Sequence, residues 1–460
     1  MLEIYDTLSA QKKPFQPITP NEVKIYVCGQ TVYDVCHIGH ARSMIVFDTI
    51  ARYLKSQNYK VIFTRNITDV DDKIINRAAL NNESCDDLTE RQINLMHQDE
   101  RDLGLMPLDH EPRATKFIAE IISLIQLLMD NQVAYIAQSG DICFEIKKFK
   151  DYGKLAKRDL EKLISGARVD INEGKKSPLD FVLWKLSKPG EPQWDSPWGA
   201  GRPGWHIECS AMATSILGQP FDIHGGGMDL KFPHHENEIA QAEAAHHKTF
   251  ANYWMHAGLL NINDEKMSKS LNNFFTIQDV LKEYSAEVVR YFMISSHYRS
   301  PVNYTKDNMQ QAHQSLTTLY TALRGLTLSQ PIQNNVAAEE KFITAMNDDF
   351  NTPIALSALF DIAHDINKLR DANKIEEATQ LANTLVKLGN IVNILTSNPE
   401  DFLRGDINSD LANTVEDLII RRKKARDEKN WREADKIRDE LQKLNVAIED
   451  KAGVTTWRKK

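Results

Sequence analysis

The stretch Val23–His40, which reads VKIYVCGQTVYDVCHIGH, decides the fold of this chain. It begins with the apolar and β-branched run VKIYV, which leads into CGQT and therefore predicts a strand that ends at a turn. Apolar residues then recur at helical spacing between Ala41 and Gln57, and Val61–Ile67 predicts a second strand. A strand, a helix and a strand within about 45 residues indicate a βαβ unit with a parallel strand pair.

The composition places the chain among ordinary globular proteins. It has 460 residues, of which 42% are hydrophobic and only five are cysteines. This length predicts about three domains, and the ordinary glycine and proline contents exclude collagen-like and disordered classes. The sparse cysteines, with no export-signal pattern at Met1–Asp6, predict a cytoplasmic protein. The longest apolar stretch, Phe117–Met129, is too short to span a membrane, so no membrane partner is expected.

The charge is unevenly distributed along the chain. The formal net charge is −8, but Arg421–Lys460 contains 14 basic and 8 acidic side chains. This segment therefore carries +6, and the other 420 residues carry −14. A basic carboxyl-terminal segment is compatible with a polyanionic partner in spite of the acidic total.

The remaining sequence indicates several further regions. Ala114–Met129 predicts a helix and Asp141–Ile146 a strand, which together indicate an inserted subdomain. The insertion ends in Ser187–Trp205, where proline and glycine residues predict a loop-rich return. The pattern is mainly helical from Tyr284 to Thr396, and Arg421–Leu444 predicts a further helix before a strand at 446–450.

The tetrapeptide His37-Ile38-Gly39-His40 lies between the first strand and the helix that follows. A helix N-terminus presents free N–H groups and the positive end of the helix dipole, which attract phosphate. Two imidazoles at this place could donate hydrogen bonds to a triphosphate, and Gly39 would let a nucleotide approach the backbone. The alternative is a capping turn with surface histidines.

The pentapeptide Lys266-Met267-Ser268-Lys269-Ser270 lies before Thr276–Asp279, which has the form of a capping box. Two lysines beside serine hydroxyls on a loop suit a mobile clamp on the β- and γ-phosphates of a nucleotide. A solvated lysine loop is the alternative.

The motifs HIGH and KMSKS, in this order, resemble the signatures of class I aminoacyl-tRNA synthetases. Further segments resemble the cysteinyl-tRNA synthetases in particular: GQTVYD, TDVDDKI, GRPGWHIECSAM, FDIHGGGMDLKFPHHENEIAQ and the tail RKKARDEKNWREADKIRDEL. The resemblance implies an α/β fold: a Rossmann-like parallel-sheet catalytic domain with an inserted subdomain, an α-helical bundle, and a small C-terminal anticodon-binding domain. The two halves of the catalytic domain are expected at 1–115 and 201–260, with the insertion at 116–200 between them. The KMSKS loop and stem-contact region is expected at 261–310, the helical bundle at 311–400 and the anticodon-binding domain at 401–460.

The resemblance also implies an activity. ATP and L-cysteine would give cysteinyl-adenylate and pyrophosphate, and the cysteinyl group would then pass to tRNA(Cys). Mg²⁺ is expected with ATP, and a monomer is the family expectation. Two rival hypotheses remain: a ligase that joins activated cysteine to a small amine, and a non-catalytic RNA-binding relative. The long basic C-terminus disfavours the first rival, and the intact motifs disfavour the second.

A metal site is suggested by the distribution of histidines. Seven of the 14 histidines fall between His206 and His256, and His234 and Glu238 have the i, i+4 spacing that places two side chains on one face of a helix. Spacing alone cannot pair Cys28 with Cys209. The resemblance implies that these two cysteines join His234 and Glu238 around one zinc ion per chain, with the substrate thiol as an additional ligand. The alternative is a structural zinc that only joins two parts of the core. Cys36, Cys85 and Cys143 are interpreted as ordinary thiols.

The resemblance assigns further roles by motif. The expected catalytic residues are His37, His40, Lys266 and Lys269, and the expected ATP-binding residues are Gly39, Gly226, Asp229 and Lys269. The expected cysteine-binding residues are Gly29, Thr31, Thr68, Trp205 and His224, and the expected tRNA-binding residues are Arg426, Trp431 and Asp435. Core packing is the alternative for Trp205 and His224, and a solvated helix face is the alternative for the basic tail. Asp69, Asp71 and Asp72 are interpreted as helix N-caps without a chemical role.

Overall fold

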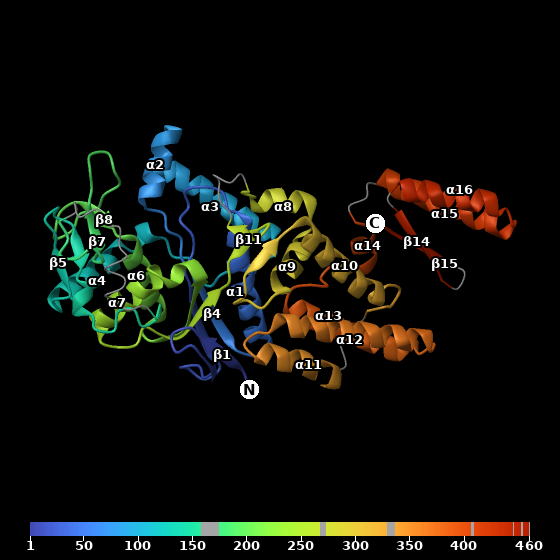
Figure 1. Ribbon diagram of the computed structural model, residues 1–460, viewed down its shortest axis with the longest axis horizontal. Helices are drawn as coiled ribbons and strands as arrows, with labels where there is room; N and C mark the ends of the chain where they lie inside the picture. Colours follow the sequence, from blue (N-terminus) through green and yellow to red (C-terminus); the bar gives the residue numbers. More distant parts are fainter. Residues whose placement is uncertain are drawn as a thin grey trace. The chain divides into compact units, whose positions relative to one another are not determined.

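A computed structural model gives the fold (Figure 1). Contacts divide the chain into two compact units, of which the first comprises Met1–Met309 and Phe342–Leu356 and the second Gln310–Lys341 and Ser357–Lys460. No helix among the described residues is long and apolar enough to cross a membrane. The described residues are 1–157, 174–266, 273–328, 336–405, 409–444, 446–451 and 454–459.

A four-stranded parallel sheet forms the centre of the first unit, with the strand order β10-β9-β3-β4. The βαβ prediction is confirmed, because β3 and β4 pair in parallel on either side of helix α1 in the chain. The strands and this helix are β3 (Glu22–Val27), α1 (Ile38–Ser56), β4 (Lys60–Arg65), β9 (Phe221–Gly227) and β10 (Ala251–Ala257).

The strand β4 ends two residues earlier than the pattern predicts. After Arg65 the regular pairing with β3 ends, and Asn66 and Thr68 bond instead with the loop that follows β3. The Thr68 N–H donates to the Gln30 carbonyl, and the Val32 N–H donates to the Thr68 carbonyl, each at 3.2 Å. The helix α1 begins at Ile38, earlier than the apolar pattern predicts, since His37 already serves as its N-cap.

The strand β3 lies between β4 and β9, so the chain leaves β3 in one direction toward β4 and later returns on its other side. Open α/β sheets bind ligands at the carboxyl ends of the strands where the strand order reverses in this way. Cys28 follows β3 directly at this place, and its N–H donates to the Gly225 carbonyl of β9 at 3.0 Å.

A second four-stranded sheet is antiparallel and has the order β5-β6-β7-β8. Helices α4, α6 and α7 pack beside this sheet (Figure 1), and their shared core includes Phe144, Trp184 and Ile207. The predicted strand near Asp141 is confirmed as β6, whereas β7 and β8 had no recognised signal. The bounds are α4 (Ile118–Asp130), β5 (Ala134–Ile136), β6 (Ile142–Phe144), β7 (Phe181–Leu186), β8 (Gly201–Pro203), α6 (Trp205–Leu217) and α7 (His234–His246).

The remaining elements up to Tyr304 lie outside the parallel sheet. The capping box predicted at Thr276 is confirmed, because the Thr276 side chain accepts from the Asp279 N–H at the start of α8. The bounds of these elements are β1 (Glu3–Asp6), β2 (Gln11–Pro14), α2 (Asp72–Asn81), α3 (Cys85–Asp102), β11 (Leu260–Ile262), β12 (Glu265–Lys266), α8 (Ile277–Glu283), α9 (Ala286–Ile294) and β13 (Val302–Tyr304).

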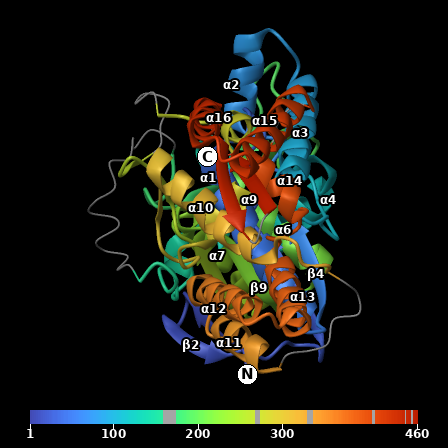
Figure 2. The ribbon, with the colours of Figure 1, turned by 90° about the vertical axis from the view of Figure 1, so that its right-hand side faces the viewer.

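The rest of the chain is helical, as predicted, and ends in the hairpin β14-β15. The helices α12 and α13 run side by side (Figures 1 and 2), and a small separate core of Val415, Ile437 and Trp457 joins α15 and α16 to the hairpin. The bounds are α10 (Lys306–Leu323), α11 (Val336–Asn347), α12 (Thr352–Asp371), α13 (Ile375–Ile391), α14 (Pro399–Arg404), α15 (Ser409–Asp427), α16 (Trp431–Lys443), β14 (Val446–Lys451) and β15 (Val454–Lys459).

Candidate active site

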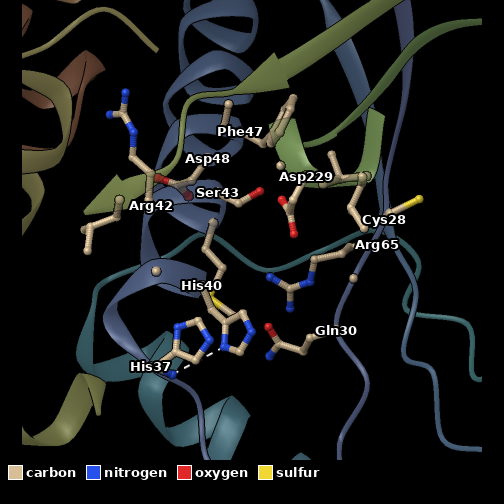
Figure 3. A pocket seen from close by; sticks show the side chains of 18 of the residues that line it. Cys28, Gln30, His37, His40, Arg42, Ser43, Phe47, Asp48, Arg65 and Asp229 are labelled. Atoms are coloured by element: carbon tan, nitrogen blue, oxygen red, sulfur yellow. Dashed lines mark hydrogen bonds between the residues drawn. The ribbon is translucent and has the colours of Figure 1, made fainter. Parts of the chain in front are cut away.

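A cavity of about 420 Å³ opens at the carboxyl ends of the parallel strands, beside the N-terminus of α1 (Figure 3). Figure 3 shows the side chains of His40, Arg65 and Asp229 around it. Eight residues with predicted site roles line the cavity: Cys28, Gly29, Thr31, His37, Gly39, His40, Trp205 and Asp229. The fold thus brings residues of the amino-terminal motifs together with residues from the later half of the parallel sheet.

His37 and His40 begin helix α1 with their rings stacked, with 3.6 Å between the ring centroids (Figure 3). The Nδ1 atom of His40 accepts a hydrogen bond from the His37 N–H at 3.3 Å. Burial, with the neighbouring His37, lowers the pKa of His40 to about 3, so its imidazole is neutral. Because Nδ1 accepts a hydrogen bond, the single proton lies on Nε2. His40 is therefore a neutral hydrogen-bond donor at the positive end of a helix dipole.

Residues that flank the KMSKS motif are attached to the start of α1. The Ile38 N–H donates to the Phe275 carbonyl at 3.0 Å, and the Ile277 N–H donates to the Cys36 carbonyl at 3.1 Å. Lys266 ends β12, where it pairs with Asn261, a residue of the cavity wall. Lys269 lies outside the described residues. The structure thus joins residues Phe275 and Ile277, which follow the KMSKS motif in the chain, to the start of the HIGH helix.

The four predicted metal ligands form one buried group. Suitable donor atoms of Cys28, Cys209, His234 and Glu238 all lie within 4.8 Å of one another. The Cys28 Sγ lies 3.1 Å from Glu238 Oε1, and His234 Nε2 lies 2.8 Å from the same oxygen. The exposed fractions of these residues range from 0% for Glu238 to 7% for Cys28. Cys28 follows β3, Cys209 lies on α6, and His234 and Glu238 share α7.

The chemistry of this group fits zinc. Zinc bonds of about 2.0 to 2.3 Å in a tetrahedral set place ligand atoms roughly 3.3 to 3.8 Å apart, so side chains within 4.8 Å could close around an ion by small rotations. Burial raises the pKa of the Cys28 thiol. Although burial also acts on Cys209, hydrogen bonds from Cys28 and His234 lower the pKa of Cys209 to about 6. A cation would stabilise both thiolates in this buried place.

A second set of four residues satisfies the same distance criterion: Cys28, His224, His235 and Glu238. It shares a cysteine and the glutamate with the predicted set. His224 Nε2 lies 2.5 Å from Glu238 Oε2, and the His224 ring stacks on Trp254. His235 lies in the histidine-rich region, but the sequence patterns predict no role for it.

Other histidines surround the metal group. His206 Nδ1 lies 2.8 Å from His234 Nδ1, and the Trp205 ring stacks on His234 with 4.3 Å between centroids. Histidine ligands in metal sites commonly use their second nitrogen in a hydrogen bond of this kind, which fixes the ring orientation. Sequence reasoning placed Trp205 and His206 near ligand Cys209 but could not recognise the pairing, because His206 and His234 are 28 residues apart.

Buried neutral histidines make stability depend on pH. Burial lowers the pKa of His256 to about 3, below the ordinary value of 6.5. Below pH 6.5 the unfolded chain binds a proton at this residue and the folded chain does not. Stability therefore falls as the pH decreases from 6.5 toward 3, by about 1.4 kcal/mol per pH unit for this residue. We expect His256→Gln to remove this contribution. Urea unfolding of metal-free protein at pH 6.5 and pH 5.0 measures it.

His234, with its pKa raised to about 10, is protonated in the folded state throughout this window, and its contribution to the pH dependence is the same in both proteins and cancels in the comparison. The free energy of unfolding should fall less for His256→Gln than for the wild type, with a difference of about 2 kcal/mol. Equal losses in the two proteins would contradict the buried neutral state of His256.

The predicted cysteine-binding residues lie on two adjoining segments. Thr31 and Thr68 form a parallel β-bridge, and the Gly29 N–H donates to Asn66 Oδ1 at 2.9 Å. A Cβ atom on Gly29 would lie 1.7 Å from the Asn66 carbonyl oxygen, so only glycine fits. Thr68 and His224 do not appear in the cavity wall, although Thr68 is attached to the loop that forms it. Sequence reasoning missed Asn66, since its role depends on a contact across 37 residues.

The predicted nucleotide-binding glycines lie at the carboxyl end of β9. Gly226 is buried, and a Cβ atom there would lie 2.7 Å from the His235 ring. A Cβ atom on Gly225 would meet the Phe47 ring at 2.3 Å, which shows how closely α1 packs on β9. Asp229 follows them and faces the cavity (Figure 3).

The three aspartates of the TDVDDKI segment have different structural roles. Asp71 is the N-cap of α2, as predicted, because its side chain accepts from the Lys73 N–H. The N-cap interpretation is wrong for the other two. The Asp69 carboxylate accepts hydrogen bonds from the N–H and the hydroxyl of Thr115. The Asp72 carboxylate forms ion pairs with Lys185 and Arg202. Spacing could not reveal these partners, which come from distant segments.

The predicted tRNA-binding residues lie on α15 and α16. Trp431 is 60% exposed. Arg426 Nη1 lies 2.6 Å from Asp450, which also pairs with Arg422. Hydrogen bonding by Arg422 lowers the pKa of Asp450 to about 2, so this carboxylate partly neutralises both arginines. Asp435 lies 3.4 Å from Arg438.

Three family models match successive parts of the chain. Residues 14–314 match the model described as tRNA synthetases class I (C) catalytic domain. Residues 341–396 match a DALR domain, and residues 408–458 match the Cysteinyl-tRNA ligase anticodon binding domain.

Curated relatives match over the whole length. A cysteine–tRNA ligase of Coxiella burnetii (strain Dugway 5J108-111) is 55% identical over 460 residues, which cover 99% of this chain and 100% of that protein. A cysteine–tRNA ligase of Vibrio atlanticus (strain LGP32) is 55% identical over 462 residues, which cover 100% of each chain.

Solved structures share the fold at low identity. Mycobacterium tuberculosis methionyl-tRNA synthetase, in complex with methionyl-adenylate, aligns with a TM-score of 0.59 and 16% identity over 81% of this chain and 89% of that one. The ternary complex of Agrobacterium radiobacter K84 agnB2 LeuRS, tRNA and LeuAMS aligns with a TM-score of 0.59 and 13% identity over 84% and 85%. These matches confirm the Rossmann-like, parallel-sheet fold with helical C-terminal regions.

Proposed function

The chain belongs to the family of cysteine–tRNA ligases, and from this premise we propose that a zinc ion beside its nucleotide cavity selects cysteine by the substrate thiol. As a class I aminoacyl-tRNA synthetase, the chain activates cysteine with ATP, in the presence of Mg²⁺, and joins it to tRNA. The proposal about zinc is carried by one observation, the buried group of two cysteines, a histidine and a glutamate.

The ligands that we assign to zinc are Cys28, Cys209, His234 and Glu238. Thiolate sulfur is a preferred zinc donor, and this set offers two thiolates where the overlapping set offers one. Cys28 also lines the cavity, so a metal held there would be within reach of a small substrate. A zinc with a purely structural role would have no need for a ligand in the cavity wall.

Selection of a thiol needs chemistry beyond shape. Serine and cysteine are near-isosteres, and apolar pockets discriminate poorly between such pairs. When bound, zinc supplies a coordination position that accepts a soft thiolate, which a thiol forms far more readily than an alcohol does. The cysteine pocket that we propose around this position is formed by Gly29, Thr31, Thr68, Trp205 and His224.

Adenylate formation requires no enzyme nucleophile. The cysteine carboxylate attacks the α-phosphorus of ATP, the bond from that phosphorus to the bridging oxygen breaks, and pyrophosphate leaves. We assign stabilisation of the phosphate charge to the N-terminus of α1, with His40 Nε2 as a donor. His37, Lys266 and Lys269 complete the proposed catalytic set. Gly39, Gly226 and Asp229 would hold the nucleotide, and alignment of the reactants supplies the rest.

In the second step a terminal ribose hydroxyl of the tRNA attacks the cysteinyl carbonyl, and AMP leaves. We assign recognition of the anticodon to Arg426, Trp431 and Asp435. The exposed Trp431 ring offers a face on which an unstacked base could lie.

A monomer that works in the cytoplasm is proposed on the family resemblance. The rival small-amine ligase loses support because residues 408–458 match an anticodon binding domain. The rival non-catalytic relative loses support because residues 14–314 match a class I catalytic domain.

The test is an ATP–pyrophosphate exchange assay on the zinc-loaded, full-length protein. We expect exchange with cysteine and essentially none with serine at equal concentration, together with one zinc per chain by metal analysis. We also expect the protein to charge purified tRNA(Cys) with cysteine in a second assay. Absence of bound zinc would refute the zinc proposal, and equal exchange with cysteine and serine would refute selection by the thiol.

A further inference from the structure

The anticodon-binding domain, residues 408–458, has a hydrophobic core of its own. This core is formed by side chains of α15, α16 and the β14-β15 hairpin, and none of its described members comes from the helices α10 to α14. A small domain with a separate core can change its orientation unless specific contacts hold it. The polar contacts that join this domain to α10 and α14 are therefore important for its orientation. All of these elements contribute to the second compact unit.

Arg324 lies at the centre of these contacts. It directly follows α10 and is 7% exposed. Its Nε and Nη2 atoms donate to the two carboxylate oxygens of Glu400 on α14, at 2.7 and 2.9 Å. Its Nη2 atom also donates to the Trp457 carbonyl of β15 at 2.7 Å. One guanidinium group thus binds both the helix that precedes the anticodon-binding domain and the last strand of that domain.

Trp457 connects Arg324 to the core of the domain. Its side chain is buried within that core, and its Nε1 atom donates to Glu416 Oε1 of α15 at 2.9 Å. The Arg404 guanidinium lies over the Trp457 ring, 5.2 Å from the ring centroid. Arg404 also lies 3.7 Å from Glu400 and 3.4 Å from Glu416. These residues form a group that we call the Arg324 clasp: Arg324, Glu400, Arg404, Glu416 and Trp457.

The β14-β15 hairpin connects the clasp to a proposed tRNA-binding residue. Thr455 of β15 lies opposite Asp450 of β14, and its hydroxyl donates to Asp450 Oδ1 at 2.6 Å. The same carboxylate pairs with Arg426 of α15. A displacement of β15 would therefore also displace the carboxylate that holds Arg426.

We propose that Arg324 is a positioning residue, which holds the anticodon-binding domain in one orientation on α10 and thereby strengthens recognition of the anticodon. Arg324 acts through the clasp and has no contact with tRNA in this role. Arg324 and Glu400 both lie outside the residues that the three family models match. The inference rests on the proposed recognition of the anticodon by Arg426, Trp431 and Asp435. The alternative is an ion pair that only stabilises the fold.

The test uses the zinc-loaded, full-length protein with two substrates, tRNA(Cys) and the same tRNA with its anticodon bases replaced. We expect Arg324→Met to raise the KM for tRNA(Cys) by about 10-fold. The reason is that loss of a hydrogen bond to a charged group shifts an equilibrium by about 10- to 100-fold, and the apparent affinity falls with the fraction of correctly oriented molecules. The kcat/KM for the altered tRNA should not change, because this tRNA lacks the anticodon contacts. Cysteine-dependent ATP–pyrophosphate exchange should keep its wild-type rate.

Two further variants make the result specific. Glu400→Ala removes the acceptor in the clasp and should also raise the KM for tRNA(Cys), and the double variant should lose little more than either single one. Lys387→Met breaks a partly buried ion pair with Glu339 between α13 and α11, and it should leave the KM for tRNA(Cys) unchanged. Thermal unfolding is measured on every variant. If Arg324→Met fails to fold, Glu400→Ala still tests the proposal.

Equal losses of kcat/KM with both tRNAs would mean that Arg324 only stabilises the fold, and the proposal would be wrong. An unchanged KM for tRNA(Cys) in Arg324→Met and Glu400→Ala would also overturn it. Additive losses in the double variant would contradict a common action of Arg324 and Glu400. Failure of the anticodon assignment gives a different result: the wild-type protein would then charge both tRNAs equally well, and Arg324 would have no anticodon contact to support.

Discussion

Replacement Cys209→Ser is expected to lower cysteine-dependent ATP–pyrophosphate exchange by at least about 100-fold, because loss of a direct metal ligand should cost no less than loss of its supporting contacts. The Cys209 thiol has a pKa lowered to about 6, in spite of its burial, and lies in the group that contains Cys28, His234 and Glu238. A serine hydroxyl keeps its proton at neutral pH and is a poor zinc donor. Bound zinc and the affinity for cysteine should fall together.

The matched control is Cys143→Ser. Cys143 is also a fully buried cysteine, but it lies on β6 and does not belong to the metal group. Both replacements exchange a buried sulfur atom for oxygen. A difference between the two variants should therefore come from the role of Cys209 as a metal ligand. Metal analysis, exchange kinetics and thermal unfolding are measured on both proteins. If Cys209→Ser retained zinc and the wild-type affinity for cysteine, the assigned ligand set would be wrong.

Replacement His40→Ala is expected to lower the rate of adenylate formation by about 10²- to 10³-fold, which is the usual cost of removing one hydrogen-bond donor that stabilises developing charge. His40 is neutral, with a pKa lowered to about 3, and its Nδ1 atom accepts the His37 N–H. Its Nε2–H is therefore oriented at the N-terminus of α1, in the cavity wall. Single-turnover measurement of pyrophosphate release would give the rate directly.

His364→Ala provides the comparison for this variant, because His364 is an exposed histidine on α12 and no role is assigned to it. His40→Ala should retain zinc and bind cysteine as the wild type does, since the metal group does not include His40. The loss should therefore appear in the rate of the chemical step. An unchanged rate, or a loss explained by reduced zinc, would contradict the proposed contact with phosphate.

Much of the fold could be predicted because its signals are local. The apolar run at Val23 and the helical spacing after Ala41 correctly predicted β3 and α1. Thr276 and Asp279 are close enough in the sequence to show their capping box directly. The strands β7 and β8 were missed, since short buried strands in an antiparallel sheet carry little periodicity over so few residues.

The candidate site could be predicted only in part from residue patterns. His234 and Glu238 are one helical turn apart, so their common face follows from spacing. The assignment of Cys28 and Cys209 depended on resemblance to a family, because their separation in the sequence carries no geometric information. The predicted N-cap roles of Asp69 and Asp72 were wrong for the same reason: their partners Thr115 and Arg202 come from distant segments.

The amino-acid order was sufficient to indicate a βαβ unit, a phosphate-binding helix N-terminus and a family resemblance, since each of these depends on residues that are neighbours in the chain. Tertiary structure was needed to join Cys28, Cys209 and α7 into one buried group. It also oriented the proton of His40. Burial and hydrogen bonding between distant segments determine protonation and donor direction, and no local pattern in the sequence reports them.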